Sequence, residues 1–174
     1  MKKNVFLILF ILLALIVTGS ILIKKNRSFT KQNAKIGLPA PNFELKDISG
    51  KKWRLEDLKG KIVILNFWAS WCNDCKEEKK SIQAYLSKNG TPEDLIFITV
   101  LYKDNPFMAN ELVKKGGYTF PVLIDDGDVS TIYGIRGVPE TFLIDKKGIL
   151  RHKILGPVQW DNPHIIPHLR QVLM

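Results

Sequence analysis

The fold is decided by residues 62–75, which read IVILNFWASWCNDC. Residues 62–68 are, apart from Asn66, a run of β-branched, aliphatic and aromatic side chains, which predicts a buried central strand. Cys72 and Cys75 follow within a few residues, and from residue 73 onward the apolar residues recur at helical spacing. The stretch therefore predicts a strand, a cysteine pair and a helix in direct succession.

Outward from this stretch, strand patterns and helix patterns alternate along the chain. The predicted elements are a hairpin of residues 43–48 and 52–55, a helix from 73 to 88, a strand at 95–102, a helix at 107–116, a strand at 121–124, a helical turn at 129–133, a hairpin of 141–145 and 149–155, and a helix in the last dozen residues. This order predicts an α/β fold with a mixed central sheet flanked by helices and an N-terminal hairpin extension. With 174 residues, the chain has room for one such domain, residues 37–174, and an extra segment.

The extra segment, residues 1–23, is expected to form a signal-anchor transmembrane helix. Residues 5–23 carry no charge over 19 positions, and Lys2 and Lys3 precede them. At ~1.5 Å per residue, a helix of this length nearly spans the ~30 Å hydrocarbon core of a bilayer. A cleaved signal peptide is the alternative, with small residues near position 19, but the apolar run continues beyond that site and favours an uncleaved anchor.

The net charge of +9 is concentrated at the N-terminus. Residues 1–35 hold seven basic and no acidic residues, whereas 19 basic residues stand against 17 acidic ones from residue 36 onward. The nearly neutral remainder argues against a nucleic-acid-binding protein, and residues 24–36 are interpreted as a basic linker. A count of flanking positive charges would keep the domain in the cytosol. The export-like order of a short basic start, an apolar run and a long polar remainder instead predicts a domain on the periplasmic or extracytoplasmic side of the cytoplasmic membrane.

The two cysteines are the only ones in the chain, and their position at a predicted helix start favours redox chemistry. Unpaired N–H groups and the positive end of the helix dipole favour a thiolate at Cys72, and Cys75, one turn later, can close a disulfide. Cys72 is thus the expected nucleophile and Cys75 the resolving cysteine. A structural disulfide would close too small a loop to stabilise much, and a zinc site would need ligands beyond these two.

Two motifs resemble a known family. Residues 68–78, WASWCNDCKEE, and residues 133–145, YGIRGVPETFLID, are similar to the membrane-anchored thioredoxin-like proteins of the TlpA/ResA/DsbE group. The second motif is most similar to the DsbE (CcmG) branch, which serves cytochrome c maturation. The resemblance runs from about Gly37 to the C-terminus and includes a tryptophan-containing final helix. It implies a thioredoxin-like fold.

The resemblance also implies roles for individual residues. Val138-Pro139 matches the cis-proline turn that faces the cysteine pair, where the backbone of Val138 would pair with an extended substrate. Trp71 matches the tryptophan that covers the nucleophile, and Glu140 matches a family acid beside the proline. Glu78 matches an acid that manages the proton of the resolving cysteine, although a solvated acid in an early helical turn is the plainer interpretation.

The dipeptide between the cysteines departs from the family. Asn73-Asp74 stands where the family usually has a proline, and the negative charge of Asp74 near Cys72 opposes a thiolate there. The reduction potential is therefore left open.

The primary functional hypothesis is a disulfide reductase with no cofactor other than its own cysteine pair. By resemblance, the substrate would be apocytochrome c or a protein that carries it, and a membrane thiol-disulfide transporter would return the electrons. A general periplasmic disulfide reductase or oxidant of TlpA type is the alternative within the same chemistry, and an isomerase is a further one. A copper-carrying chaperone is the alternative from another class, but it needs a third ligand that the sequence does not place. Peroxidase activity fits the Trp-Cys-x-x-Cys arrangement less well than dithiol exchange.

Overall fold

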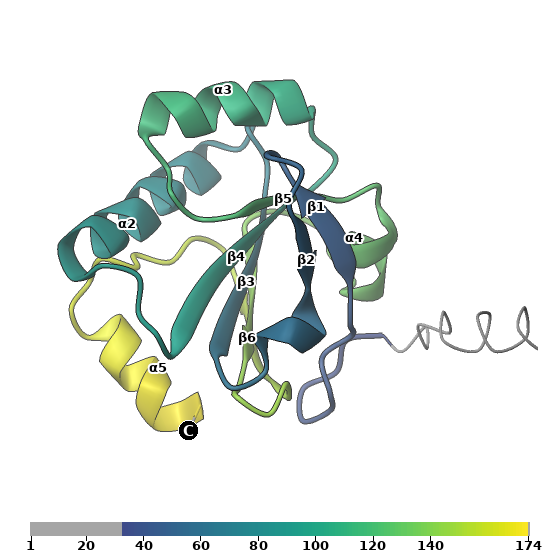
Figure 1. Ribbon diagram of the computed structural model, residues 1–174, viewed down its shortest axis with the longest axis vertical. Helices are drawn as coiled ribbons and strands as arrows, with labels where there is room; N and C mark the ends of the chain where they lie inside the picture. Colours follow the sequence, from purple (N-terminus) through teal and green to yellow (C-terminus); the bar gives the residue numbers. More distant parts are fainter. Residues whose placement is uncertain (1–32, 174) are drawn as a thin grey trace, which may run out of the picture. The chain divides into compact units, whose positions relative to one another are not determined.

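The computed structural model describes residues 33–173, coloured by sequence position in Figure 1. The predicted anchor, residues 1–23, and the linker up to residue 32 lie outside the described residues. Between residues 33 and 173, no helix combines the length and the apolar character that crossing a membrane requires.

The described residues form seven strands in one mixed sheet, with helices on both of its faces (Figure 1). The elements are β1 (Glu44–Asp47), β2 (Lys52–Arg54), η1 (Leu55–Leu58), β3 (Ile62–Trp68), α2 (Asn73–Asn89), β4 (Leu95–Leu101), α3 (Pro106–Gly116), β5 (Val122–Ile124), α4 (Asp128–Ile132), β6 (Glu140–Ile144), β7 (Leu150–Leu155) and α5 (Ile165–Leu173). The strand order is β2-β1-β5-β4-β3-β6-β7. Strand β4 is parallel to β3 and β5, and all other neighbours are antiparallel. The predicted mixed sheet and thioredoxin-like α/β fold are confirmed.

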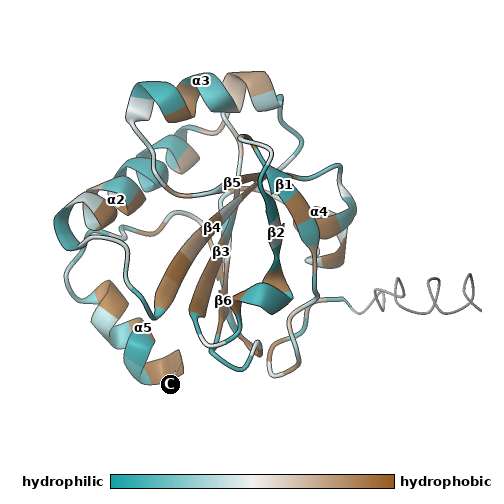
Figure 2. Ribbon diagram, viewed as in Figure 1, coloured by the Kyte–Doolittle hydropathy of each residue, from teal (hydrophilic) through white to brown (hydrophobic). Residues whose placement is uncertain are grey.

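Strand β3 lies inside the sheet and is buried along its whole length. Ile62, Ile64 and Trp68 belong to the core on the side of α2, α3 and α5, while alternate residues such as Leu65 and Phe67 belong to the core on the side of α4. Both faces are apolar because helices cover both, which explains the continuous hydrophobic run in the sequence. Figure 2 shows the same hydrophobic colouring along β3 and β4.

Three details differ from the sequence-based expectation. A short 3-10 helix, η1, follows the N-terminal hairpin. Contacts with the domain begin ahead of the predicted boundary at residue 37, because the N–H of Ala34 donates to the carbonyl oxygen of Ile132 at 3.0 Å. The tryptophan expected in the final helix is Trp160, which precedes α5, and that expectation is wrong. Trp160 is fully buried in the irregular segment after β7, where it packs edge-on against Phe97.

Candidate redox-active site

Cys72 and Cys75 are joined in a disulfide at the start of α2, with their Cα atoms 5.2 Å apart. Cys72 is the N-cap residue, and its Sγ accepts a hydrogen bond of 3.1 Å from the N–H of Cys75. Cys72 retains 8% exposure, whereas Cys75 is completely buried. The helix start therefore offers a backbone donor to the outer sulfur and shields the inner one from solvent.

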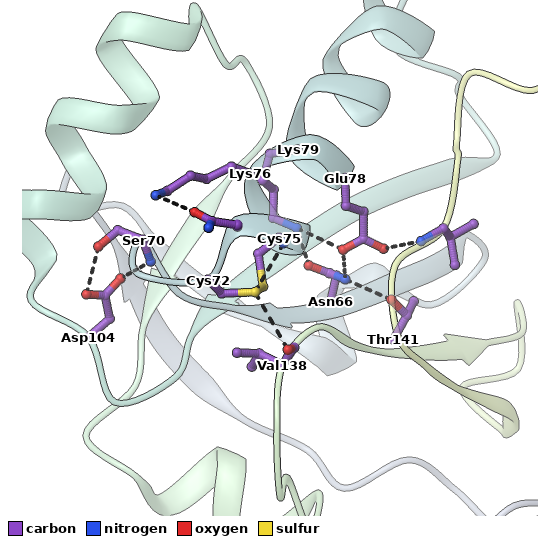
Figure 3. The surroundings of a disulfide bond; sticks show 12 residues. Asn66, Ser70, Cys72, Cys75, Lys76, Glu78, Lys79, Asp104, Val138 and Thr141 are labelled. Carbon is purple, nitrogen blue, oxygen red and sulfur yellow. Dashed lines mark hydrogen bonds and ion pairs between the residues drawn. A yellow bond between two sulfur atoms is a disulfide. The ribbon is translucent and has the colours of Figure 1, made fainter.

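The peptide bond between Val138 and Pro139 is cis, as predicted, and it faces the cysteine pair. The carbonyl oxygen of Val138 lies 3.6 Å from the Sγ of Cys72 (Figure 3). Val138 itself is partly exposed. The outer sulfur and the backbone of a partly exposed residue thus lie side by side.

The loop between β4 and α3 holds the residues just before Cys72. Asp104 accepts hydrogen bonds from the backbone N–H and the hydroxyl of Ser70, the latter at 3.0 Å (Figure 3). The indole N–H of Trp71 points to the carbonyl oxygen of Lys103 at 3.4 Å. Trp71 nevertheless remains 59% exposed, so most of its ring surface is available beside Cys72.

Beneath the disulfide lies a buried polar cluster, formed by Asn66, Glu78, Lys79 and Thr141 (Figure 3). Asn66 is the hub: its amide nitrogen donates to a carboxylate oxygen of Glu78 at 2.9 Å and to the hydroxyl of Thr141 at 2.8 Å. Its amide oxygen accepts from the ammonium of Lys79. Every polar group of the Asn66 side chain is therefore satisfied, as burial requires.

The second carboxylate oxygen of Glu78 fastens the segment after β7 to helix α2. It accepts from the backbone N–H of Val158 and from the indole N–H of Trp160, each at 3.1 Å. Ser81, one turn further along α2, accepts from the N–H of Trp160 and donates to the carbonyl oxygen of Val158. The predicted acid thus lies in the protein interior, and the interpretation of Glu78 as a solvated surface acid is wrong.

Lys79 is completely buried, which is rare for a lysine. Its ammonium lies 3.4 Å from the Glu78 carboxylate and 5.4 Å from the centre of the Trp68 ring. Burial lowers the pKa of Lys79 to about 8, although the neighbouring Glu78 carboxylate acts in the opposite direction. The lysine consequently remains mostly protonated at neutral pH.

Glu140, the acid next to the cis-proline, is also buried but differs in its partners. One carboxylate oxygen accepts from the backbone N–H of Arg136 at 3.3 Å, and the other forms an ion pair of 2.7 Å with Lys153 on β7. Lys153 is 30% exposed, so this pair lies near the surface. Glu140 is therefore connected to solvent through its partner, whereas Glu78 is not.

The structure places Trp71, Val138, Pro139 and Glu78 around the disulfide, whereas the side chain of Glu140 shares a strand face with Phe142, on the α4 side of the sheet. Sequence reasoning missed Asn66, Lys79, Thr141 and Asp104. Asn66 had a signal, because it is the only polar residue in an otherwise apolar strand. Lys79 had a weaker one, since it follows Cys75 by four residues and so shares its helical stripe. Nothing local marks Asp104, whose partner Ser70 is 34 residues away.

In the part of the chain that the structure describes, no three histidine, cysteine, aspartate or glutamate side chains come together in an arrangement that could hold a metal ion.

Comparison with known proteins places this site in a family. The model of the AhpC/TSA family matches residues 36–153. The chain is 39% identical over 160 residues to the thiol-disulfide oxidoreductase ResA of Bacillus anthracis, covering 90% of this chain and 91% of the relative. It is 35% identical over 164 residues to ResA of Bacillus subtilis, covering 94% and 91%.

A solved structure agrees with these relatives. The crystal structure of a putative thiol:disulfide interchange protein DsbE from Chlorobium tepidum superimposes with a TM-score of 0.71 at 26% identity, covering 82% of this chain and 100% of that one. The chain belongs to the AhpC/TSA family, as a thiol-disulfide oxidoreductase of the ResA/DsbE/TlpA type.

Proposed function

We propose that this chain is a membrane-anchored reductase of protein disulfides on the extracytoplasmic side of the cytoplasmic membrane. Cys72 is the nucleophile and Cys75 the resolving cysteine. The observation that carries the proposal is the asymmetry of the pair: the Sγ of Cys72 is the outer sulfur, receives the Cys75 N–H and lies beside the Val138 carbonyl. A thiolate at Cys72 would keep that donor and gain from the helix dipole.

The reaction consists of two exchanges. In the first, the Cys72 thiolate attacks one sulfur of the substrate disulfide, a mixed disulfide forms, and the other substrate sulfur leaves as a thiolate. In the second, Cys75 gives up its proton and attacks the Sγ of Cys72, which re-forms the Cys72–Cys75 disulfide and releases the second substrate thiolate. The substrate gains two electrons, and the cysteine pair loses them.

The surface around Cys72 suits an extended polypeptide. The backbone of Val138 can pair with a substrate strand, and the exposed ring of Trp71 offers an apolar contact on the other side of the sulfur. Glu140 supports this edge by holding the N–H of Arg136, which fixes the turn that leads into the cis-proline. Trp71, Val138 and Glu140 therefore form the proposed substrate-binding side.

The proposed partners follow from the family resemblance. The substrate is apocytochrome c, or a protein that carries it, and a membrane thiol-disulfide transporter re-reduces the cysteine pair. Residues 1–23 hold the chain in the lipid bilayer, and no cofactor beyond the cysteine pair takes part. A related protein named for thiol:disulfide interchange supports the chemistry of this proposal, while its direction and substrate rest on the resemblance alone.

Trapping of mixed disulfides tests the proposal. Cys75→Ala leaves the first exchange intact and removes the second, so an apocytochrome c or its carrier should accumulate on Cys72 in cells and be identified by mass spectrometry. Cys72→Ala is the matched control and should trap nothing. Recovery of c-type cytochromes with Cys72→Ala, in a host that lacks its own gene, would refute the reductase role. A glutathione equilibrium that favours the dithiol form of this protein would instead support an oxidant.

A further inference from the structure

A fully buried cation lies beside the fully buried acid of this site. Glu78 and Lys79 are neighbours on α2, both side chains have no exposed surface, and they lie three and four residues after Cys75. Residues at these spacings share one face of a helix. Figure 3 shows both side chains running from α2 toward Asn66, next to the disulfide.

Only hydrogen-bond donors contact the Glu78 carboxylate among the interactions that the structure describes. They are the backbone N–H of Val158, the indole N–H of Trp160, the amide nitrogen of Asn66 and the ammonium of Lys79. A protonated carboxyl group would have to donate one hydrogen, and none of these four partners can accept it. The surroundings of Glu78 are therefore those of an ionised carboxylate.

Three of those donors are neutral, and Lys79 alone supplies a compensating charge. A buried ion without its partner is strongly destabilised, so a carboxylate in this position without Lys79 would tend to bind a proton. Asn66 orients the pair, since its amide oxygen accepts from Lys79 while its amide nitrogen donates to Glu78.

We propose that Lys79 is a positioning residue for the resolving step: it keeps Glu78 ionised beneath Cys75, so that this carboxylate can accept the Cys75 proton. The proposal deepens the proposed function and rests on it. Among the described interactions, no hydrogen bond or ion pair joins Lys79 or Glu78 to the Cys75 sulfur. Glu78 shares a helical face with Cys75, and Lys79 acts through Glu78.

The charges support this role during the proton transfer. Before the transfer, the site holds a neutral Cys75 thiol, a carboxylate and an ammonium. After it, the S–H bond of Cys75 is broken, the proton is on Glu78, and the Cys75 thiolate takes over as the anion that balances Lys79. The buried site has no net charge in either state, so neither state leaves an uncompensated ion in the interior. The thiolate then attacks Cys72, and its electron pair forms the new S–S bond while the substrate sulfur leaves as a thiolate. Glu78 then releases the proton, which restores the ion pair of the oxidised protein.

Few other titratable groups face Lys79. Strand β3 contributes Asn66 and Trp68, β6 contributes Thr141, and the segment after β7 contributes Trp160, none of which titrates in the physiological range. On α2 itself, the ionisable neighbours are Glu78 and, in the reduced protein, Cys75. Burial lowers the pKa of Lys79 to about 8, which still leaves it protonated at neutral pH.

A two-step probe separates this role from a structural one. The reduced full chain is mixed with a stoichiometric aromatic disulfide that releases one coloured thiolate in each exchange, so attack by Cys72 and resolution by Cys75 give successive phases. In Lys79→Met, the second phase should be about tenfold slower at neutral pH, with its pH midpoint raised by about one unit or more. The first phase should stay unchanged. Lys80→Met is the matched control, because Lys80 is an exposed neighbour paired with Glu77.

The proposal is wrong if the second phase of Lys79→Met has the same pH midpoint as that of the wild type. Should Lys79→Met not fold, the double variant Glu78→Gln/Lys79→Met removes both buried charges together and tests whether the second phase depends on the pair. It should keep a slow second phase from acidic to neutral pH, and wild-type kinetics in it would overturn the proposal. Failure of the proposed function looks different: the two phases would behave as described here, but Cys75→Ala would trap no protein in cells.

Discussion

The two sulfurs of one disulfide lie in opposite surroundings. Cys72 has residual exposure, a backbone donor and the carbonyl of Val138 beside it, and the exposed ring of Trp71 precedes it. Cys75 has no exposure and lies on the same helical stripe as a buried acid and a buried lysine. One turn of helix therefore separates a side that can meet another protein from a side that can exchange a proton without contact with solvent.

The two sides of the Cys72–Cys75 motif therefore differ in the kind of interaction on which they depend. In the proposed function, the outer side binds substrate through backbone groups and shape, which suit many substrates because every polypeptide offers the same hydrogen bonds. The inner side depends on charges in a nonpolar interior, where each ion has a large effect and must be compensated. Changes on the outer side should therefore alter recognition, and changes on the inner side should alter stability and pH dependence.

Alkylation of the reduced protein should show the largest contrast. We expect a small alkylating reagent to label Cys72 almost exclusively, because thiolate character and access both favour the outer sulfur. Mass spectrometry of peptides after brief labelling measures the ratio. The urea-unfolded protein is the control and should label both cysteines. Equal labelling of the two cysteines in the folded protein would abolish the distinction between the two sides.

Loss of the buried acid should destabilise the fold substantially. Glu78→Leu removes the partner of Lys79 and leaves an unpaired buried cation, which should lower the free energy of unfolding by about 3 kcal/mol or more. Urea denaturation measures the change. Glu77→Leu is the control on the same helix, because Glu77 is exposed and forms its ion pair with the exposed Lys80. Similar losses in the two variants would show that the buried pair has no special importance.

The pH dependence of the free energy of unfolding should reveal the lowered pKa of Lys79. Its pKa is lowered by burial to about 8, against 10.5 for an ordinary lysine. Between these values, the unfolded chain binds a proton that the folded chain has released, so the free energy of unfolding should rise with pH. The slope from this group is at most about 1.4 kcal/mol per pH unit.

Comparison with Lys79→Met separates the contribution of Lys79 to that slope from the contributions of the other titrating groups. Both proteins are unfolded with denaturant in their oxidised forms, so that no thiol titrates. The wild type should gain stability relative to the variant as the pH rises from about 8 toward 10.5. A constant difference across this range would mean that Lys79 does not change its protonation on folding.

The smallest effect is expected from a substitution on the outer side, beside Cys72. Trp71→Ala should raise KM for a protein disulfide about fivefold to tenfold, through loss of an apolar contact worth about 1 kcal/mol. Stability should change little, because the ring is 59% exposed. Val172→Ala on α5 is a matched truncation of another exposed apolar residue and should leave KM unchanged. A loss of stability without a change in KM would place Trp71 with the core.

The fold was predictable because its signals are local. The apolar run of β3, the cysteine pair at the start of α2 and the proline ahead of β6 each stand in a few consecutive residues. The polar cluster was not predictable, because its members come from distant parts of the chain. Asn66 and Thr141 are 75 residues apart, and Glu78 and Trp160 are 82 residues apart. Trp160 was placed in the wrong element, since a buried tryptophan in an irregular segment has no periodic pattern to mark it.

The hydrogen bonds from Val158 and Trp160 to Glu78 mean that the redox centre extends to the last part of the chain. A truncation after Leu155 would preserve all seven strands and both cysteines, yet it would remove two of the donors that surround the Glu78 carboxylate. The smallest unit with native reactivity is therefore longer than the smallest unit with a complete sheet. Ligands or fusions that displace residues 158–160 should, by the same reasoning, inhibit the enzyme without approaching its sulfurs.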